Sequence, residues 1–186
     1  MNIEIISGSP RKDSLSHRVV LFLQKYLSEK TEHNVNIIDV RDWELPLQQE
    51  VFTSVDRTPE MLRPLAKHVF EANAFIMVSP EYNGSYTAAL KNLFDHFPKQ
   101  SHKPFGIVTA SPGALGGMRA ALQLQTLIYA LFGIGSPHML ITPMVEKKFA
   151  EDGTLLDESF QKNIDVFVSE FLWLAEHISK VTTHQS

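Results

Sequence analysis

The stretch Ser7-Gly8-Ser9-Pro10-Arg11-Lys12-Asp13-Ser14-Leu15-Ser16-His17 carries most of the information on what this chain can do. It follows an apolar run, Ile3 to Ile6, and leads into a helical pattern that begins near Leu15. A turn rich in hydroxyl groups at the start of a helix offers an anion backbone N–H groups and the positive end of the helix dipole. The Arg11 guanidinium adds a planar fork that suits phosphate oxygens. The stretch therefore predicts a phosphate site between a strand and a helix; the alternative is an N-cap followed by a surface turn.

The composition of this turn differs from the common nucleotide-binding motifs. No G-x-x-x-x-G-K-S/T sequence occurs, and Gly8 stands alone, so G-x-G-x-x-G is absent as well. A pyrophosphate is usually approached by bare backbone. A loop built on serines therefore favours a terminal monophosphate that is held by side chains.

The composition of the whole chain is that of a soluble globular protein, with 44% hydrophobic and 20% charged residues. A formal net charge of -4 gives no general attraction to nucleic acid or to anionic membranes. The absence of cysteine excludes disulfides and thiol nucleophiles, so any redox chemistry must come from a bound cofactor. The chain starts with a strand rather than a signal segment and has no apolar run long enough to span a bilayer, so we expect a cytoplasmic protein.

Strand and helix patterns alternate along the chain, which predicts a single domain over residues 1–186. The helical patterns cover residues 15–27, 59–70, 86–97, 124–131 and 160–178. Short apolar runs predict five strands that are covered on both faces: Ile3–Ser7, Val35–Val40, Phe75–Ser79, Phe105–Ala110 and His138–Thr142. We therefore expect an α/β fold, a doubly wound parallel sheet of order 2-1-3-4-5 with helices on both faces.

Ligands of such sheets bind beyond the carboxyl ends of the strands, at the switch point between strands 1 and 3. The loops after strands 1, 3 and 4 should therefore carry the chemistry. The loop after strand 3 is Ser79-Pro80-Glu81-Tyr82-Asn83-Gly84-Ser85-Tyr86, and the loop after strand 4 is Ser111-Pro112-Gly113-Ala114-Leu115-Gly116-Gly117. The loop after strand 2 is interpreted as an ordinary mixed segment.

The loop after strand 3 has the features of a ring-binding turn. Asn83-Gly84 readily adopts positive φ and could present backbone N–H groups to a flat heteroaromatic ring. Tyr82 offers a face for stacking, and Ser85 could cap the helix that begins near Tyr86. The alternative is a strand-to-helix turn in which Tyr82 packs against protein. The glycine-rich loop after strand 4 suits the opposite rim of the ring, unless it is a plain loop.

Together these residues resemble the NADPH-dependent FMN reductases of the flavodoxin-like superfamily, which include quinone, azo-dye and chromate reductases. The resemblance extends from Met1 through roughly the last helix, and its specific part is the Pro-Glu-Tyr-Asn-Gly segment. The residues that carry it are Gly8-Ser9-Pro10-Arg11 with Ser14, then Pro80-Glu81-Tyr82-Asn83-Gly84-Ser85 followed by Leu90-Lys91-Asn92 and Asp95.

The resemblance implies a set of cofactor contacts. Ser9, Arg11 and Ser14 would hold the FMN phosphate, and Ser16 or His17 would complete the seat, although Leu15-Ser16-His17 departs from the commoner Phe-Asn spelling. The loop after strand 3 would pass along the isoalloxazine edge, and the loop after strand 4 would flank the other side. The implied set is Ser9, Arg11, Ser14, Ser16, His17, Pro80, Glu81, Tyr82, Asn83, Gly84, Ser85, Ser111, Gly113, Gly116 and Gly117.

The implied chemistry is hydride transfer from NADPH or NADH to FMN, followed by electron transfer to a quinone, a flavin or a similar flat, electron-poor acceptor. Alternate use of one site predicts ping-pong kinetics. No catalytic side chain is assigned: Glu81 is interpreted as a charged turn residue and Arg119 as a solvated helix charge. Two alternatives stay open, an FMN-binding electron carrier or redox-sensing module, and an enzyme that binds NADPH without a flavin.

The remaining sequence patterns bear on two questions: whether the chain carries a metal site or a serine hydrolase site, and whether it forms an oligomer. No His-Glu-x-x-His spacing and no G-x-S-x-G elbow occur, so we predict no metal site and no serine hydrolase. The helix after Ser85 carries an aromatic stripe, in which Tyr86 and Phe97 exceed what a sheet would cover. We expect a homodimer or homotetramer that is formed through this helix, as the resemblance also implies; the alternative is a helix buried wholly within its own chain.

Overall fold

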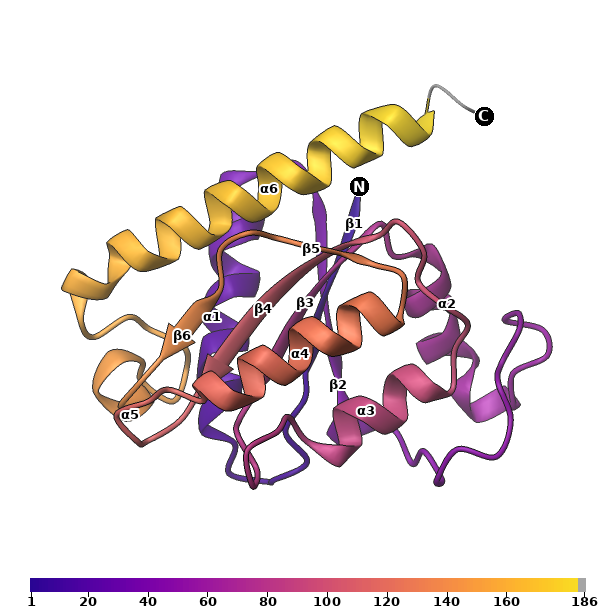
Figure 1. Cartoon of the computed structure of the whole chain (residues 1–186), viewed down its shortest axis with the longest axis horizontal. Coiled ribbons are helices and arrows are strands. Elements are labelled where there is room, and N and C mark those ends of the chain that lie inside the picture. The colour runs from indigo at the N-terminus through magenta and orange to yellow at the C-terminus, as the bar shows by residue number, and fades with distance from the viewer. Residues whose placement is uncertain (184–186) are drawn as a thin grey trace.

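The computed structural model describes residues 1–183 and contains a parallel sheet with helices on both faces (Figure 1). The strands are β1 (Asn2–Ser7), β2 (Asn34–Asp39), β3 (Ala74–Ser79), β4 (Pro104–Ala110), β5 (Ile134–Gly135) and β6 (Leu140–Thr142). The helices are α1 (Leu15–Lys30), α2 (Arg63–Glu71), α3 (Ala88–Asp95), α4 (Met118–Ala130), α5 (Val145–Lys148) and α6 (Gln161–Thr183). Short 3₁₀ turns lie at Val40–Asp42, Glu60–Leu62 and Glu158–Phe160.

The strand order is β2-β1-β3-β4-β5 and every pairing is parallel, which confirms the predicted topology. The far edge differs from the prediction, because two short strands share the fifth position. β5 pairs with the start of β4, and β6, which corresponds to the predicted strand His138–Thr142, pairs with its end. Pro137 lies between them and has no N–H to donate, so a continuous ladder cannot form there.

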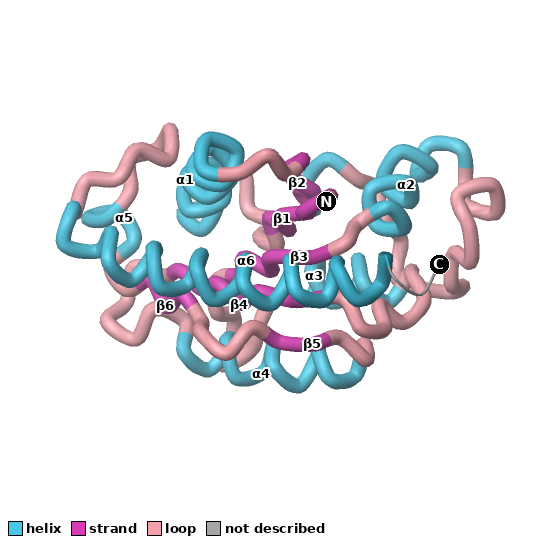
Figure 2. The backbone as a smooth tube through the Cα atoms, turned by 90° about the horizontal axis from the view of Figure 1, so that it is seen from above, coloured by secondary structure: helices cyan, strands magenta, loops and turns pink. Residues whose placement is uncertain are grey.

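The sheet separates two apolar cores. α2, α3 and α4 bury their apolar faces on one side, while α1 and α6 pack on the other. Figure 2 shows α1 and α4 on opposite sides of the strands. Gly106 in β4 allows a close approach of α6, since a Cβ there would lie 3.0 Å from Phe167 and 3.1 Å from Phe171. The central strands β1, β3 and β4 are therefore buried over almost their whole length, which leaves the sheet ends for function.

The entry into α3 differs from the predicted entry. Thr87, not Ser85, caps the helix: its Oγ1 accepts a hydrogen bond from the Leu90 N–H at 3.1 Å and donates to the carbonyl of Gly8. Ser85 instead pairs with Tyr82 in a tight turn. Thr87 is fully buried, so α3 is fixed directly against the first turn after β1.

No helix within residues 1–183 combines the length and the apolar character that crossing a membrane requires.

Candidate functional site

A pocket of about 250 Å³ lies beyond the carboxyl ends of β1, β3 and β4, and the three loops predicted to carry chemistry meet there. This is the switch point of the sheet, where α/β proteins of this topology bind ligands. The pocket is lined by Ser9, Arg11, Asp13, Ser14, Leu15, Ser16, Pro80, Glu81, Tyr82, Ala110, Ser111 and Pro112.

The first wall of the pocket is the serine-rich turn that leads into α1. Ser14 is the N-cap of the helix and accepts a hydrogen bond from the His17 N–H at 3.3 Å. Its Oγ lies 3.1 Å from that of Ser16, and the Ser9 Oγ accepts from the Arg11 N–H at 3.4 Å. No acidic residue occupies the first turn of α1 to offset the helix dipole, although exposed Asp13 lines the same pocket. The turn therefore clusters hydroxyl groups at a helix N-terminus, as the sequence predicts.

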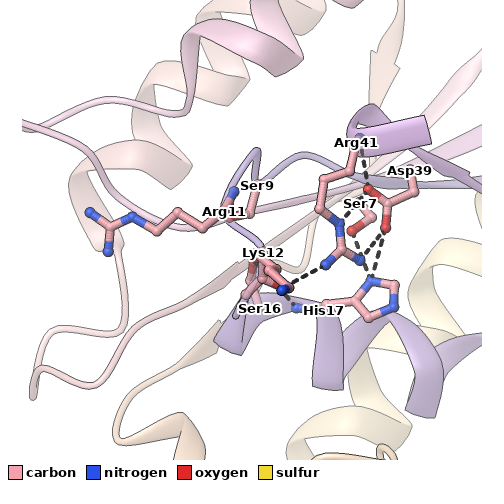
Figure 3. Close-up of polar contacts among 9 residues, drawn as sticks. Ser7, Ser9, Arg11, Lys12, Ser16, His17, Asp39 and Arg41 are labelled. Atoms are coloured by element: carbon pink, nitrogen blue, oxygen red, sulfur yellow. Dashed lines mark hydrogen bonds and ion pairs between the residues drawn. The ribbon is translucent and has the colours of Figure 1, made fainter. Parts of the chain in front are cut away.

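Arg11 and Tyr82 line one side of the pocket, and each brings a polar group that a ligand could bind. The Arg11 guanidinium lies 4.8 Å from the centroid of the Tyr82 ring, and Figure 3 shows it directed away from the neighbouring Asp39 and Arg41. Arg11 makes no ion pair within residues 1–183. The Tyr82 hydroxyl is buried and has no hydrogen-bond partner there. A buried polar group without a partner costs about 1–3 kcal/mol, so the Tyr82 hydroxyl favours a polar ligand, while exposed Arg11 offers a positive charge to an anion.

The turn after Tyr82 forms the rim of the pocket. Asn83 and Gly84 have φ values of 51° and 83°, and Tyr82 and Ser85 exchange backbone hydrogen bonds of 2.8 and 3.1 Å. Positive φ at both central residues is the geometry of a type I′ turn. Asn83, Gly84 and Ser85 do not line the pocket, and a Cβ on Gly84 would meet nothing within 4 Å. Their contact with a ring stays a prediction.

The loop after β4 contributes Ser111 to the pocket, while its three glycines lie outside the lining. Gly116 and Gly117 have φ values of 60° and 86° and pack against β6 and β4. A Cβ on Gly116 would lie 2.7 Å from both Ile141 and the backbone nitrogen of Pro143, whereas one on Gly113 would meet only Ser111, at 3.7 Å. Gly116 and Gly117 therefore serve loop conformation and close packing; their predicted approach to a cofactor stays untested.

Glu81 and Arg119 are not the independent solvated charges that the sequence suggested. The Glu81 carboxylate accepts hydrogen bonds from the Arg119 Nε at 2.7 Å and from the Arg119 backbone N–H at 3.2 Å. This ion pair connects the loop after β3 to the start of α4.

Sequence reasoning missed a cluster at the end of β2, drawn in Figure 3. Buried Asp39 accepts from the Arg41 side chain at 2.9 and 2.5 Å, and Arg41 also donates to the Lys12 carbonyl at 3.0 Å. Arg41 therefore anchors the serine-rich turn to β2, and the interpretation of this loop as an ordinary segment was wrong. The signal was an Asp and an Arg at the end of a strand that lies next to β1 in the predicted order.

This cluster also holds His17 away from the pocket. The His17 Nδ1 lies 3.0 Å from the Ser7 Oγ and 3.3 Å from the Asp39 carboxylate, and the ring lines a separate hollow beside Arg41. A Ser-His-Asp catalytic triad uses both ring nitrogens, one for each partner. Here Ser7 and Asp39 share Nδ1, so the three residues serve a structural role.

Burial and charge shift the pKa values of this cluster. Burial lowers the pKa of His17 below 6.5, and the Arg41 charge lowers it further against the opposing charges of Asp39 and Asp42. Burial alone would raise the pKa of Asp39, but hydrogen bonds from Arg41 and the charges of Arg41 and His17 outweigh it and lower that pKa. The folded protein therefore favours neutral His17 and ionised Asp39.

The His17 shift predicts a pH dependence of stability. Because the folded pKa is lowered, the contribution of His17 is fully present above the unfolded pKa of about 6.5 and is lost as the pH falls through the folded value. We expect urea unfolding between about pH 8 and about pH 5 to show less loss of stability for His17→Asn than for the wild type. Exposed His138→Asn is the control and should match the wild type. Parallel pH curves for His17→Asn and the wild type would contradict the assignment.

Within residues 1–183, no group of three or more His, Asp or Glu side chains is arranged to hold a metal ion.

Comparison with known proteins places this geometry in a family. The chain is 29% identical over 176 residues to an FMN-dependent NADPH-azoreductase of Staphylococcus saprophyticus, a match that covers 90% of this chain and 92% of the relative. The structure is similar to FerB, a flavoenzyme NAD(P)H:(acceptor) oxidoreductase from Paracoccus denitrificans, with a TM-score of 0.76, 26% identity and coverage of 95% and 97% of the two chains. A flavodoxin from Pseudomonas aeruginosa, at 20% identity, a TM-score of 0.55 and coverage of 96% and 97%, shares the fold. Residues 1–144 match the family described as NADPH-dependent FMN reductase, and the chain belongs to that family.

Proposed function

We propose that this protein uses FMN to take hydride from NADPH or NADH and passes the electrons to a flat, electron-poor acceptor such as a quinone, a flavin or an azo compound. Membership of the family supports the FMN and NAD(P)H parts of this function. The observation that carries the proposal for this chain is the pocket at the switch point, where Arg11 and the buried Tyr82 hydroxyl, both without a polar side-chain partner among residues 1–183, meet the start of α1.

The residues of the pocket fit FMN. Ser9, Ser14 and Ser16 offer hydroxyl groups near the N-terminus of α1. Arg11 offers a guanidinium that no carboxylate in the described part of the chain pairs with, and together these groups suit a phosphate dianion. Tyr82 offers an aromatic face beside this seat and a buried hydroxyl that lacks an acceptor. We therefore assign the phosphate to the serine-rich turn and the ring to the loops after β3 and β4.

FMN, when it is bound, supplies the hydride-accepting and electron-donating chemistry. The protein binds and orients: Arg11 and the serines hold the phosphate end, and the Tyr82 turn fixes the ring plane. A single pocket that serves both the nicotinamide and the acceptor requires the two to bind in turn, so we propose ping-pong kinetics. Parallel double-reciprocal plots would support this order, and intersecting plots would contradict it.

The direct test is to mix FMN-loaded protein with NADPH in the absence of any helper protein. We expect the flavin absorbance to bleach rapidly, because the pocket itself would admit the nicotinamide. A stable yellow protein would instead indicate an electron carrier or a redox-sensing module. A colourless protein that takes up no added FMN would overturn the flavin assignment and favour an enzyme that binds NADPH alone.

We also propose a homodimer or homotetramer, with a contact that includes α4. The aromatic stripe of α3 was expected to form this contact, but Phe97 is buried against Phe52 and Phe70 within the chain. Large apolar side chains are exposed on α4 and at its two ends instead: Leu115, Met118, Leu122, Tyr129 and Phe132. This exposed stripe supports α4, rather than α3 alone, as the surface that meets a second copy.

A further inference from the structure

The N-terminus of α4 lacks a cap of its own. Its N-cap residue is Gly117, which has φ of 86° and no side chain to accept a hydrogen bond, and the first turn carries no acidic residue. The first N–H groups of a helix have no partner within the helix and attract negative charge. A negatively charged group from elsewhere in the chain is therefore stabilised at this position.

Glu81 is that group, although it lies 38 residues from Arg119 in the sequence. One carboxylate oxygen accepts the Arg119 backbone N–H at 3.2 Å, and the other accepts from Nε at 2.7 Å and pairs with Nη2 at 2.5 Å. The side chain of Glu81 is only 12% exposed and lines the pocket, while that of Arg119 is 69% exposed. A nearly buried carboxylate in the pocket wall is thus balanced by one solvent-exposed guanidinium and a helix N-terminus.

We propose that Glu81 and Arg119 are positioning residues that join the two loops of the pocket and that, as a balanced charge pair, set the relative affinity of the protein for oxidised and reduced FMN. The inference rests on the proposed placement of FMN in this pocket. Reduced flavin carries more negative charge than oxidised flavin. An unbalanced carboxylate in the wall would repel the reduced form selectively, because a partly buried charge is poorly screened.

Substitutions at Arg119 and at Glu81 are expected to change the ratio of the dissociation constants for reduced and oxidised FMN in opposite directions. Arg119→Gln leaves Glu81 with only the N-terminus of α4 to balance its charge, and it should raise the ratio of the dissociation constants of reduced and oxidised FMN about tenfold. Glu81→Gln leaves Arg119 unbalanced and should lower the ratio, but only about threefold, since that guanidinium is mostly in water. The double variant Glu81→Gln/Arg119→Gln removes both charges and should return the ratio close to the wild-type value.

The experiment measures FMN binding by anaerobic titration, once with oxidised FMN and once with FMN reduced by dithionite. The control is Asp95→Asn, which removes one negative charge from the Lys91–Asp95 pair on α3, away from the pocket lining; its ratio should equal that of the wild type. Arg119→Lys keeps the charge and should also keep the ratio, which separates charge from loss of folding.

The outcomes distinguish this inference from the proposed function. If the pair only joins the two loops, either single substitution would weaken the binding of oxidised and of reduced FMN equally, and the double variant would show no recovery. That result would overturn the inference. If the wild type binds FMN and every variant keeps its ratio, the inference also fails while the proposed function stands. If the wild type binds neither redox form, the proposed function fails with it.

Discussion

Replacing Arg11 by alanine is expected to weaken FMN binding by about 10- to 100-fold. Hydrogen bonds to charged groups contribute about 1.5–3 kcal/mol, and every 1.4 kcal/mol changes affinity about tenfold. Arg11 lies over the Tyr82 ring and makes no ion pair within residues 1–183, so its full charge is available to a phosphate. The other guanidinium near this turn, that of Arg41, is bound by Asp39 and cannot take its place.

Titration of flavin fluorescence with purified protein measures this loss. Arg11→Lys keeps a charge without the planar fork and should lie between alanine and the wild type. Exposed Arg57→Ala removes the same charge away from the pocket lining and should bind FMN as the wild type does. An Arg11→Ala protein with unchanged affinity would show that the phosphate lies elsewhere.

Replacing Gly116 by alanine is expected to lower the free energy of unfolding by about 2–5 kcal/mol. An L-residue in the left-handed region costs about 1–2 kcal/mol, and overpacking adds about 1–3 kcal/mol. The new methyl group would lie 2.7 Å from the Pro143 backbone nitrogen, which cannot move aside as a flexible side chain could. The loop that carries Ser111 would shift as well, so FMN binding should weaken together with stability.

Gly113→Ala is the matched control, because it adds the same methyl group to the same loop. Its Cβ would meet only the Ser111 Oγ, at an ordinary contact distance of 3.7 Å. Surface substitutions of this kind usually change stability by about 0.5 kcal/mol or less. Urea unfolding of both variants compares them directly, and equal stability for the two would contradict the assigned role of Gly116.

The sequence was sufficient to predict the fold and the place of the pocket, because both follow from periodic patterns. Alternating apolar strands and amphipathic helices imply a parallel doubly wound sheet, and such a sheet binds ligands at its switch point. Ser14 was predictable as a cap because its partner is three residues away. Thr87 was not, since its choice over Ser85 depends on reaching the Gly8 carbonyl across the fold.

The charged contacts of the site were beyond sequence reasoning for a related physical reason. Glu81 and Arg119 lie 38 residues apart and meet only when two separate loops are brought together. Asp39 and Arg41 are neighbours in the sequence, but the contact of Arg41 with the Lys12 carbonyl depends on the fold. A charged residue in a turn has the same local pattern whether water or another side chain is its partner. The glycines after β4 show the same limitation. The sequence indicates that the backbone there adopts a conformation that favours glycine, but it does not show which neighbouring residues leave no room for a side chain.

The close packing of α6 against β4 sets a lower limit on the length of a functional fragment of this protein. The family match ends at residue 144, yet Phe167 and Phe171 lie beyond that point and cover the strand whose end carries Ser111. A chain cut at the match boundary would leave one side of β4 exposed to water, and the end of β4 that lines the pocket would lose its support. The shortest functional fragment must therefore retain the final helix, although none of the side chains described in that helix lines the pocket.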